Sequence, residues 1–314
     1  MEIPWQEWAR ERGYRMACCD GAVVDEVRAE IQARRARGEL ADELGPAYLD
    51  GLTYLDGLDP SRVGSVIVLA VPRPVHRLVF HTANGPLETI LPPTYVNYSA
   101  TGERVREEIA STLLGGEHFI VPLRAPLKSI VTRAGLVSYG RNNVTYSPEF
   151  GSGQQLVGCV TEARLARGLS AEAPLPAVAP ECAHCQACRK ACPTGAIADD
   201  RFLLHAERCV TLWSESASPW PSWLPATAVR CLVGCLVCQQ VCPLNVRRLR
   251  YESLPLAFSS AETEALLAEG GPAEGDQLWQ EIAAKLASIG MDDYLEIIGR
   301  NLRMLVSSTP HAAR

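Results

Sequence analysis

The sequence lacks the features that mark several common classes of protein. Its 314 residues contain no apolar run of about 18 residues, so we predict no transmembrane helix. The first residues show no basic segment followed by an apolar one, the pattern of a secretion signal, and we predict a cytoplasmic protein. No Walker motif, no G-x-S-x-G and no G-x-G-x-x-G after a predicted strand is present. These absences argue against nucleotide-binding and nucleophile-elbow enzymes.

The sequence also has little excess charge. Lysine and arginine number 30 against 36 aspartate and glutamate residues, a formal net charge of −6. Proteins that bind nucleic acid through their overall charge are basic, so this balance argues against that class. Apolar residues make up 47%, enough to bury a core in one large domain or two ordinary ones.

Cysteine, in contrast, is abundant. The chain has 12 cysteines, and nine of them fall within residues 182–242. A chain of this length without a secretion signal is expected in a reducing compartment, where disulfides are rare. Cysteines clustered in that setting are usually metal ligands or catalysts.

Hydrophobic patterning predicts an α+β protein. Helical spacing dominates the first 60 residues, while residues 64–71 form a β-branched run typical of a buried, central strand. Asn84-Gly85 lies between two extended runs, which predicts a hairpin. Further helices are expected at 101–114, 126–134, 262–269, 277–289 and 292–306, and further strands at 118–121 and 155–160.

Composition divides the chain into three parts. We predict an N-terminal α/β lobe over residues 1–170 that holds a cofactor or substrate. An Ala/Pro-rich stretch at 171–180 reads as an extended linker. The second predicted part, a cysteine-rich domain over residues 171–250, begins with this linker. Residues 251–314 are predicted as C-terminal helices that pack on the core.

The first cysteine group follows the bacterial ferredoxin pattern. Cys182, Cys185, Cys188 and Cys192 form C-x2-C-x2-C-x3-C, followed by Pro193. In two-cluster ferredoxins, three thiolates on such a tight loop reach one cubane, and the fourth cysteine ligates the other cluster. The spacing therefore predicts a ferredoxin-like domain with two [4Fe–4S] clusters.

The second cysteine group is one ligand short. Cys235, Cys238 and Cys242 form C-x2-C-x3-C-P, and Cys209 is the natural substitute for the missing member. If each group sends its last cysteine across, one cluster takes Cys182, Cys185, Cys188 and Cys242, and the other takes Cys192, Cys209, Cys235 and Cys238. Two zinc sites are the alternative, because C-x2-C pairs also bind zinc, but the three-cysteine run argues against zinc.

The remaining four cysteines carry no predicted chemistry. Cys231 is surplus and reads as a buried free thiol, with an alternative role as a ligand. Cys159 falls in a predicted strand and reads as core. Cys18 and Cys19 are adjacent in sequence, which is rare for two ligands of one metal.

Three stretches resemble epoxyqueuosine reductase and its iron–sulfur relatives, a family related to reductive dehalogenases. Residues 126–143, which contain Arg133-Ala134-Gly135-Leu136, are similar to the family segment AEKAGLGWIGKHT. The cysteine region with Arg208-Cys209 and the ending at 234–245 carry the rest of the resemblance. Together the three cover roughly residues 60–250.

The resemblance implies a corrinoid-binding-type N-terminal lobe and an oxidoreductase that uses cobalamin. The cobalamin would lie base-off between the two lobes and receive electrons one at a time from the clusters. A low-potential donor of the ferredoxin or flavodoxin type, and a tRNA or small-molecule substrate, are the implied partners. The residues placed near the corrin by the resemblance are Arg133, Gly135, Tyr139, Gly140, Arg141, Asn142 and Asn143. For this segment, a helix cap at Gly135 and a turn at the two asparagines are the structural alternative.

The chain departs from the family at the proton donor. The family carries an Asp in a V-D-x-x-P segment, and the matching position here is Leu123, or Pro122 if the gap differs. Neither residue donates a proton. We predict Tyr139 as a substitute acid, with Tyr146 and Lys128 as alternatives. The missing acid also raises a second hypothesis, an electron-transfer protein that reduces a partner's corrinoid or flavin and has no substrate of its own.

Overall fold

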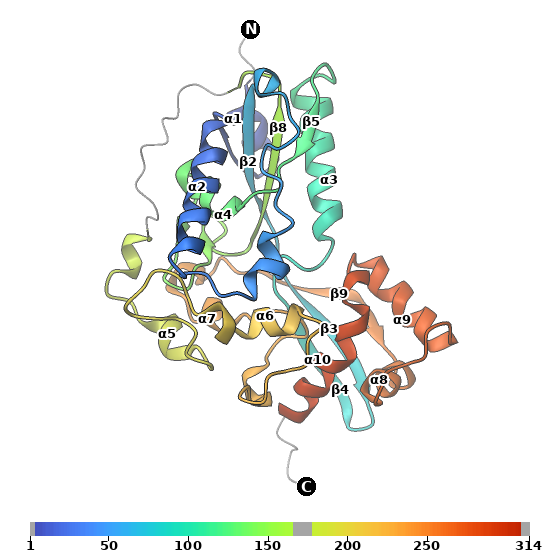
Figure 1. Ribbon diagram of the computed structural model, residues 1–314. Helices are drawn as coiled ribbons and strands as arrows, with labels where there is room; N and C mark the ends of the chain where they lie inside the picture. Colours follow the sequence, from blue (N-terminus) through green and yellow to red (C-terminus); the bar gives the residue numbers. More distant parts are fainter. Residues whose placement is uncertain (1–3, 166–177, 309–314) are drawn as a thin grey trace.

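The computed structural model describes residues 4–165 and 178–308, which form an elongated arrangement of two lobes (Figure 1). The N-terminal lobe is built on a four-stranded sheet with the order β1-β2-β8-β5. Every pairing in this sheet is antiparallel. Its strands are β1 (Arg15–Cys19), β2 (Ser65–Pro72), β5 (Ile120–Pro122) and β8 (Gln154–Thr161).

Helices cover both faces of this sheet. Side chains alternate along β2, so Ile67 and Leu69 face one layer while Val66 and Val68 face the other. One layer holds α1 (Trp5–Glu11) and α3 (Tyr98–Glu108), which continues into a π-helical turn, η3 (Ile109–Leu113). The other layer holds α2 (Ala22–Ala36) and α4 (Leu127–Arg133). Two covered faces explain why β2 reads as a continuous apolar run.

The second core lies in the opposite lobe. The hairpin of β3 (Val75–Thr82) and β4 (Gly85–Leu91) leaves the first sheet and pairs in parallel with β9 (Tyr251–Phe258). Phe80 and Phe258 stack with their ring centroids 4.6 Å apart. The apolar side chains around them also come from three helices, namely α8 (Ser260–Leu267), α9 (Gln277–Ser288) and α10 (Leu295–Ser308).

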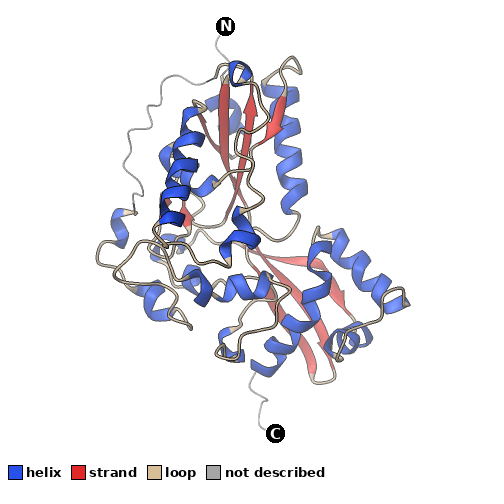
Figure 2. Ribbon diagram, viewed as in Figure 1, coloured by secondary structure: helices blue, strands red, loops and turns tan. Residues whose placement is uncertain are grey.

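The cysteine-rich segment lies beside the junction of the two lobes and consists mostly of loops and turns (Figure 2). Its helices are short: α5 (Ala187–Ala191), α6 (Val210–Glu215) and α7 (Val237–Gln240). A two-stranded ribbon of β6 (Ser138–Tyr139) and β7 (Thr145–Tyr146) faces it from the N-terminal lobe. The remaining elements are single turns: η1 (Gly45–Leu49), η2 (Pro60–Arg62), η4 (Pro180–Cys182), η5 (Ala206–Arg208), η6 (Ala226–Ala228), η7 (Pro243–Asn245) and η8 (Asp292–Tyr294).

Most predicted elements are present, and two regions differ. The hairpin at Asn84-Gly85, the central strand β2 and the C-terminal helices are confirmed. The helical interpretation of the first 60 residues is wrong at β1, whose buried residues pair with β2. The prediction also missed β9, because its alternation of polar and apolar residues becomes a strand only through pairing with β3.

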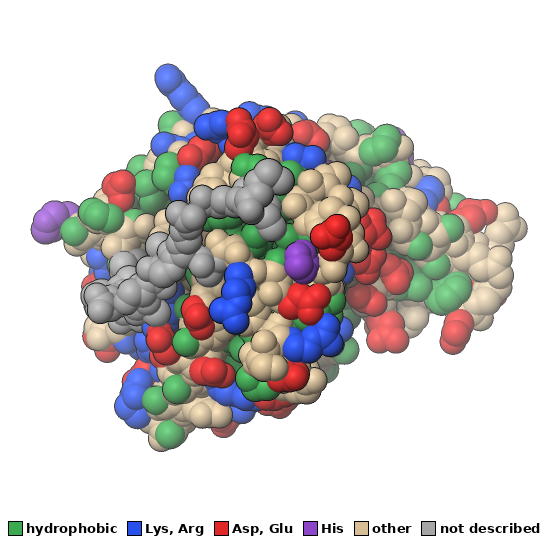
Figure 3. Space-filling model, turned by 90° about the horizontal axis from the view of Figure 1, so that it is seen from above, with side chains coloured by type: hydrophobic (Ala, Val, Ile, Leu, Met, Phe, Trp, Pro, Cys, Tyr) green, Lys and Arg blue, Asp and Glu red, His purple; other side chains and the backbone are tan. Residues whose placement is uncertain are grey.

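Two further expectations concern composition. Residues 171–177 of the predicted linker lie outside the described residues, and Val178 bridges to Tyr139. Within the described ranges, no helix combines the length and the apolar character needed to cross a bilayer. Seen from above, basic and acidic side chains are interspersed over the N-terminal lobe (Figure 3). This mixture matches the small net charge of the sequence.

Candidate functional site

The two cysteine groups fold into neighbouring turns. Each group contains one short helix, α5 or α7, and these two helices pack against each other. Pro193 and Pro243 follow the last cysteine of each group, and Pro243 begins a 3-10 turn. The two loops therefore present their thiols toward a shared region of the molecule.

The first predicted ligand set is drawn together by the fold. Burial raises the pKa of the Cys182 thiol, and the neighbouring Cys242 and Cys185 thiols raise it further. Burial also raises the pKa of Cys188, on which Cys182, Cys242 and Cys185 act as well. Cys242 thus lies with the first group although it belongs to the second group in sequence. This is the crossing that the ferredoxin pattern predicts.

The second predicted set is also close in space. Burial raises the pKa of Cys235 to about 11, with contributions from Cys209 and Cys192. Burial raises the pKa of Cys238 as well, and Cys235 and Cys209 add to the rise. Cys209 therefore lies near Cys235 and Cys238, as the predicted ligand set requires.

The spacing of the thiols bears on the zinc alternative. In the described part of the chain, no three His, Cys, Asp or Glu side chains converge on a point suited to one metal ion. Structural zinc needs four ligands at about 2.0–2.3 Å from a single ion. A cubane is wider than an ion and holds its ligands farther apart.

Arg141 and Asn245 fasten the cysteine loops to the N-terminal lobe. The Arg141 guanidinium donates from Nη2 to the Cys182 carbonyl at 2.7 Å and from Nε to the Cys185 carbonyl at 3.1 Å. Asn245 accepts from the Ser152 backbone N–H at 2.8 Å and donates to the Gln239 carbonyl at 2.7 Å. Polar clamps therefore position both loops.

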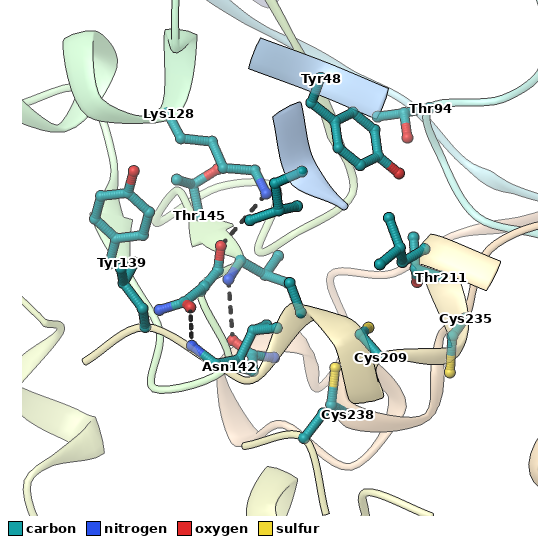
Figure 4. Close-up of a pocket in the computed structure, with 18 of the residues that line it drawn as sticks. Tyr48, Thr94, Lys128, Tyr139, Asn142, Thr145, Cys209, Thr211, Cys235 and Cys238 are labelled. Atoms are coloured by element: carbon teal, nitrogen blue, oxygen red, sulfur yellow. Dashed lines mark hydrogen bonds between the residues drawn. The ribbon is translucent and has the colours of Figure 1, made fainter. Parts of the chain in front are cut away.

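A cavity of about 780 Å³ separates the second cysteine set from the N-terminal lobe (Figure 4). Cys192, Cys209, Cys235 and Cys238 all line it, whereas none of the first set does. The opposite wall comes from residues 125–129, from Tyr139 and from residues 142–145. The remaining lining comes mainly from residues 40–52, 92–98 and 202–215. An open space thus lies between the second cysteine set and the segment that resembles the reductases.

Three of the seven residues predicted near a corrin line this cavity: Tyr139, Asn142 and Asn143. The Tyr139 hydroxyl lies 3.3 Å from Ser129 Oγ, and burial raises the pKa of the phenol to about 12. Asn142 donates to the Tyr146 hydroxyl at 2.8 Å. Asn143 donates to the Phe202 carbonyl at 2.8 Å and accepts from the Leu204 N–H at 2.6 Å. Both asparagine amides therefore have partners within the protein.

The other four predicted residues lie outside the lining, in structural positions. Arg133 forms ion pairs with Glu26 at 2.8 Å and Glu30 at 3.2 Å on α2. Gly135 has a φ of 68° and ends α4, as a helix-terminating glycine does. At Gly140 a Cβ would come within 2.6 Å of Asn142 Oδ1, so the side chain is excluded by packing. Arg141 is the clamp described above.

The position of the family acid is closed to the cavity. Leu123 is 5% exposed and packs in the apolar layer with α2 and α4. Its backbone N–H donates to the Gly158 carbonyl at 3.0 Å. Pro122 is exposed at the end of β5. Neither residue is among those that line the cavity.

Several polar residues of the cavity were not predicted from the sequence, among them Glu215 and Tyr48. Glu215, the last residue of α6, accepts hydrogen bonds from the hydroxyls of Tyr48 and Tyr95. Nothing in the sequence marks Glu215 or Tyr48, because their partners are far away along the chain. The one usable signal is the spacing of Thr211 and Glu215, which places both on one helical face after Cys209.

Lys128, an alternative acid in the sequence analysis, also lines the cavity. Its ammonium lies 3.4 Å from the Asn143 carbonyl. Burial lowers the pKa of Lys128, while Glu215, Cys209 and Cys238 act in the opposite direction. Lys128 is exposed, and it is the cavity that its side chain lines.

Comparisons with known proteins agree with this architecture. Residues 181–245 match the family described as "4Fe-4S double cluster binding domain". The chain is 30% identical over 118 residues to the epoxyqueuosine reductase of Bacillus subtilis (strain 168). This alignment covers 38% of this chain and 28% of that protein. The chain is 35% identical over 123 residues to the epoxyqueuosine reductase of Synechococcus sp. (strain RCC307), covering 38% of this chain and 35% of that protein. The match thus spans about a third of these relatives' length.

The likeness of fold extends farther than the likeness of sequence. The crystal structure of an epoxyqueuosine reductase with a tRNA-Tyr epoxyqueuosine-modified tRNA stem loop aligns with a TM-score of 0.69 and 18% identity, covering 96% of this chain and 80% of that one. The enzyme from Streptococcus thermophilus aligns with a TM-score of 0.62, 17% identity and the same coverage. In sequence over part of its length, and in fold over most of it, this chain is similar to epoxyqueuosine reductases, and residues 181–245 match a 4Fe-4S double cluster binding domain.

Proposed function

We propose that this protein is a cobalamin-dependent iron–sulfur reductase whose substrate reacts in the cavity between the lobes. One observation carries the proposal: all four thiols of the second cysteine set line that cavity. A filled interface there would have favoured an electron-transfer protein without a substrate site. An open wall of cluster ligands is what a reductase needs, because electron transfer requires the acceptor to lie close to the cluster.

Eight cysteines would hold the two clusters. Cys182, Cys185, Cys188 and Cys242 form the set remote from the cavity, and Cys192, Cys209, Cys235 and Cys238 form the set at its wall. The effects of Cys242 on the pKa of Cys182 and Cys188, and of Cys209 and Cys192 on that of Cys235, support this division, while Cys188 also acts on Cys238 of the other set. Two [4Fe–4S] clusters supply one-electron transfer at low potential, which the protein tunes by burial and by hydrogen bonds to sulfur.

The cavity suits an organic cofactor with an apolar body and amide groups at its edge. Its volume of about 780 Å³ falls within the usual range for ligand sites. Gln154 lines it, and the buried Oε1 atom of that side chain has no hydrogen-bond partner. An amide N–H of a ligand would satisfy this oxygen after a small rearrangement. Among the described lining residues there is no histidine, so this part of the chain would offer a bound cobalt no imidazole ligand.

The residues of the chain have defined roles in this proposal. A bound cobalamin would supply a cobalt centre that accepts electrons singly and reduces the substrate. Tyr139 and Phe202, whose rings meet edge-to-face at 5.2 Å, form an apolar wall. The Lys128 ammonium faces the cavity and provides positive charge for an anionic group. A tRNA base or a small molecule is the proposed substrate class, and a ferredoxin- or flavodoxin-type protein is the proposed donor.

An anaerobic cobalamin titration tests the proposal. The full chain, reconstituted with iron and sulfide, is titrated with cob(II)alamin and followed by electron paramagnetic resonance. Saturable one-to-one binding with a base-off signal is the expected result. Tyr139→Phe keeps the wall and serves as a matched control, while Val144→Trp places bulk in the cavity lining and is expected to weaken binding. About eight irons without any cobalamin binding would instead indicate an electron-transfer protein that reduces a partner's corrinoid or flavin.

A further inference from the structure

The cavity contains two carboxyl groups in different settings. Glu30 forms ion pairs with Arg34 at 2.9 Å and with Arg133 at 3.2 Å. Glu215 is half-buried, and its hydrogen-bond partners are two phenols. A carboxyl group bonded to neutral hydroxyls in a protein-lined cavity keeps its proton more readily than one bonded to arginine.

The two phenols fix the Glu215 carboxyl from separate parts of the fold. Tyr48 belongs to η1 in the N-terminal lobe. Tyr95 is buried in the second core, where its ring meets Tyr294 at 5.8 Å. Gly234 makes room for Tyr95, because a Cβ at that glycine would stand 2.3 Å from the tyrosine oxygen. Three regions of the chain thus combine to orient one acid beside the second cysteine set.

We infer that Glu215 is the acid that holds and delivers the proton in this cavity, in place of the Asp that is absent at Leu123. The inference rests on the proposed function, since it assigns a role within the same site. For an epoxide substrate, two electrons from a donor of the ferredoxin or flavodoxin class and two protons yield an alkene and water. Glu215 gives one proton to the ring oxygen as a carbon–oxygen bond breaks, and solvent supplies the second. The carboxylate then regains a proton from solvent.

The electrostatics of the site agree with this role. The titratable groups that act on Glu215 or respond to it are Tyr48, Tyr95, Tyr294, Lys128 and Cys209. Burial raises the pKa of Glu215, while the two tyrosine hydrogen bonds and Lys128 limit the rise. An acid works best when its pKa lies near the working pH. Tyr139, whose pKa is raised to about 12, is the weaker candidate.

Infrared spectroscopy tests proton storage without turnover. The full chain carrying its clusters, with neither cobalamin nor substrate, is titrated in light and heavy water. We expect a protonated carboxyl band that persists above the ordinary pH range of glutamate and is absent from Glu215→Gln. Tyr48→Phe removes a donor to the carboxylate, so it should shift the midpoint upward. Glu296→Gln, at an exposed position on α10, is the matched control. A band unchanged by Glu215→Gln, or no such band, overturns the inference.

Kinetics test proton delivery. The probe is an epoxyqueuosine-containing tRNA stem loop with excess reductant and cobalamin. Glu215→Gln should lower kcat by about 10²- to 10⁴-fold, the usual contribution of a general acid, with KM changed less than about twofold. Glu215→Asp should restore part of kcat. Wild-type kcat in a cluster-loaded Glu215→Gln overturns the inference. If the wild-type protein itself turns over no probe, the proposed function fails, and the infrared result alone decides on Glu215.

Discussion

The four-stranded sheet and the cysteine-rich segment are stabilised in opposite ways. Seven of the eight residues of β2 are buried, and helices cover both faces of the sheet. In the cysteine-rich segment, α5 has five residues and buries only Cys188, while α7 has four and buries none. Helices of this length are unstable alone in water. The sheet is held by apolar burial, whereas the loops depend on their thiols and on polar clamps.

The difference separates folding from function. The sheet carries no residue of the cluster sets, and it can form its core without metal. The cysteine loops carry the proposed cluster ligands, and we expect their structure to be coupled to the metal, as in other small metal-binding domains.

Metal removal should have the largest effect. Chelation of iron from the cluster-loaded protein leaves the loops around α5 and α7 without their main support. Hydrogen exchange followed by mass spectrometry should show near-complete loss of protection over residues 181–245 and retained protection in β2 and β8. Equal loss of protection in the sheet would contradict the contrast.

Ligand removal should affect one cluster only. Cys235→Ser is expected to lower the iron content from about eight to about four atoms per chain, since one [4Fe–4S] site loses a thiolate. Cys231→Ser is the matched control, because Cys231 is fully buried beside Leu236 and lies outside both sets. Iron and sulfide assays with electron paramagnetic resonance measure the result. Iron loss in Cys231→Ser would reassign the fourth ligand.

A core substitution in the sheet should destabilise the N-terminal lobe and leave the iron content unchanged. Ile67 is fully buried in β2, so Ile67→Ala should lower the free energy of unfolding of the N-terminal lobe by about 2–5 kcal/mol. Iron content at 25 °C should stay at the wild-type value. Denaturant unfolding followed by circular dichroism measures the first quantity. A parallel loss of iron would show that the lobes unfold together.

Loss of the Arg141 clamp should have a milder effect than loss of a cysteine ligand. Arg141→Ala removes two charge-assisted hydrogen bonds to the carbonyls of the first cysteine loop, each typically worth about 1.5–3 kcal/mol. The first cluster should lose iron to a chelator faster, at a rate followed by absorbance. Arg141→Lys retains the charge but not the forked geometry and should give an intermediate rate. An unchanged rate for Arg141→Ala would show that the thiolates alone hold the loop.

The smallest effect should be a pH dependence of the second lobe. Burial lowers the pKa of His76 in β3, with Arg73 acting in the same direction. The unfolded chain therefore binds more protons between the folded pKa and about 6.5, and stability should fall as pH drops through this window. His76→Gln should flatten that acid slope in thermal unfolding, while His81→Gln, at an exposed position on the same strand, should not. An unchanged slope in His76→Gln would assign the acid sensitivity to other groups.

The sequence by itself determined the elements whose signal is local. A few neighbouring residues are enough to specify the apolar run at β2, the Asn84-Gly85 hairpin and the spacing of the first cysteine group. The same holds for the resemblance to the reductases, which depends on short motifs. The absence of an acid at Leu123 was also readable from the sequence, and the burial of that side chain agrees with it.

Only the tertiary structure decided what depends on distant partners. β1 and β9 are strands because β2 and β3 pair with them, and the local sequence of neither one is enough to predict it. Of the residues predicted near a corrin, Arg133 and Arg141 proved to be engaged with α2 and with the first cysteine loop, since charged side chains take the partners that the fold offers. Glu215 became a candidate acid because Tyr48 and Tyr95, 167 and 120 residues away in sequence, meet it at the cavity. The surroundings of such a group depend on tertiary packing, and they cannot be predicted when its partners lie far away in sequence.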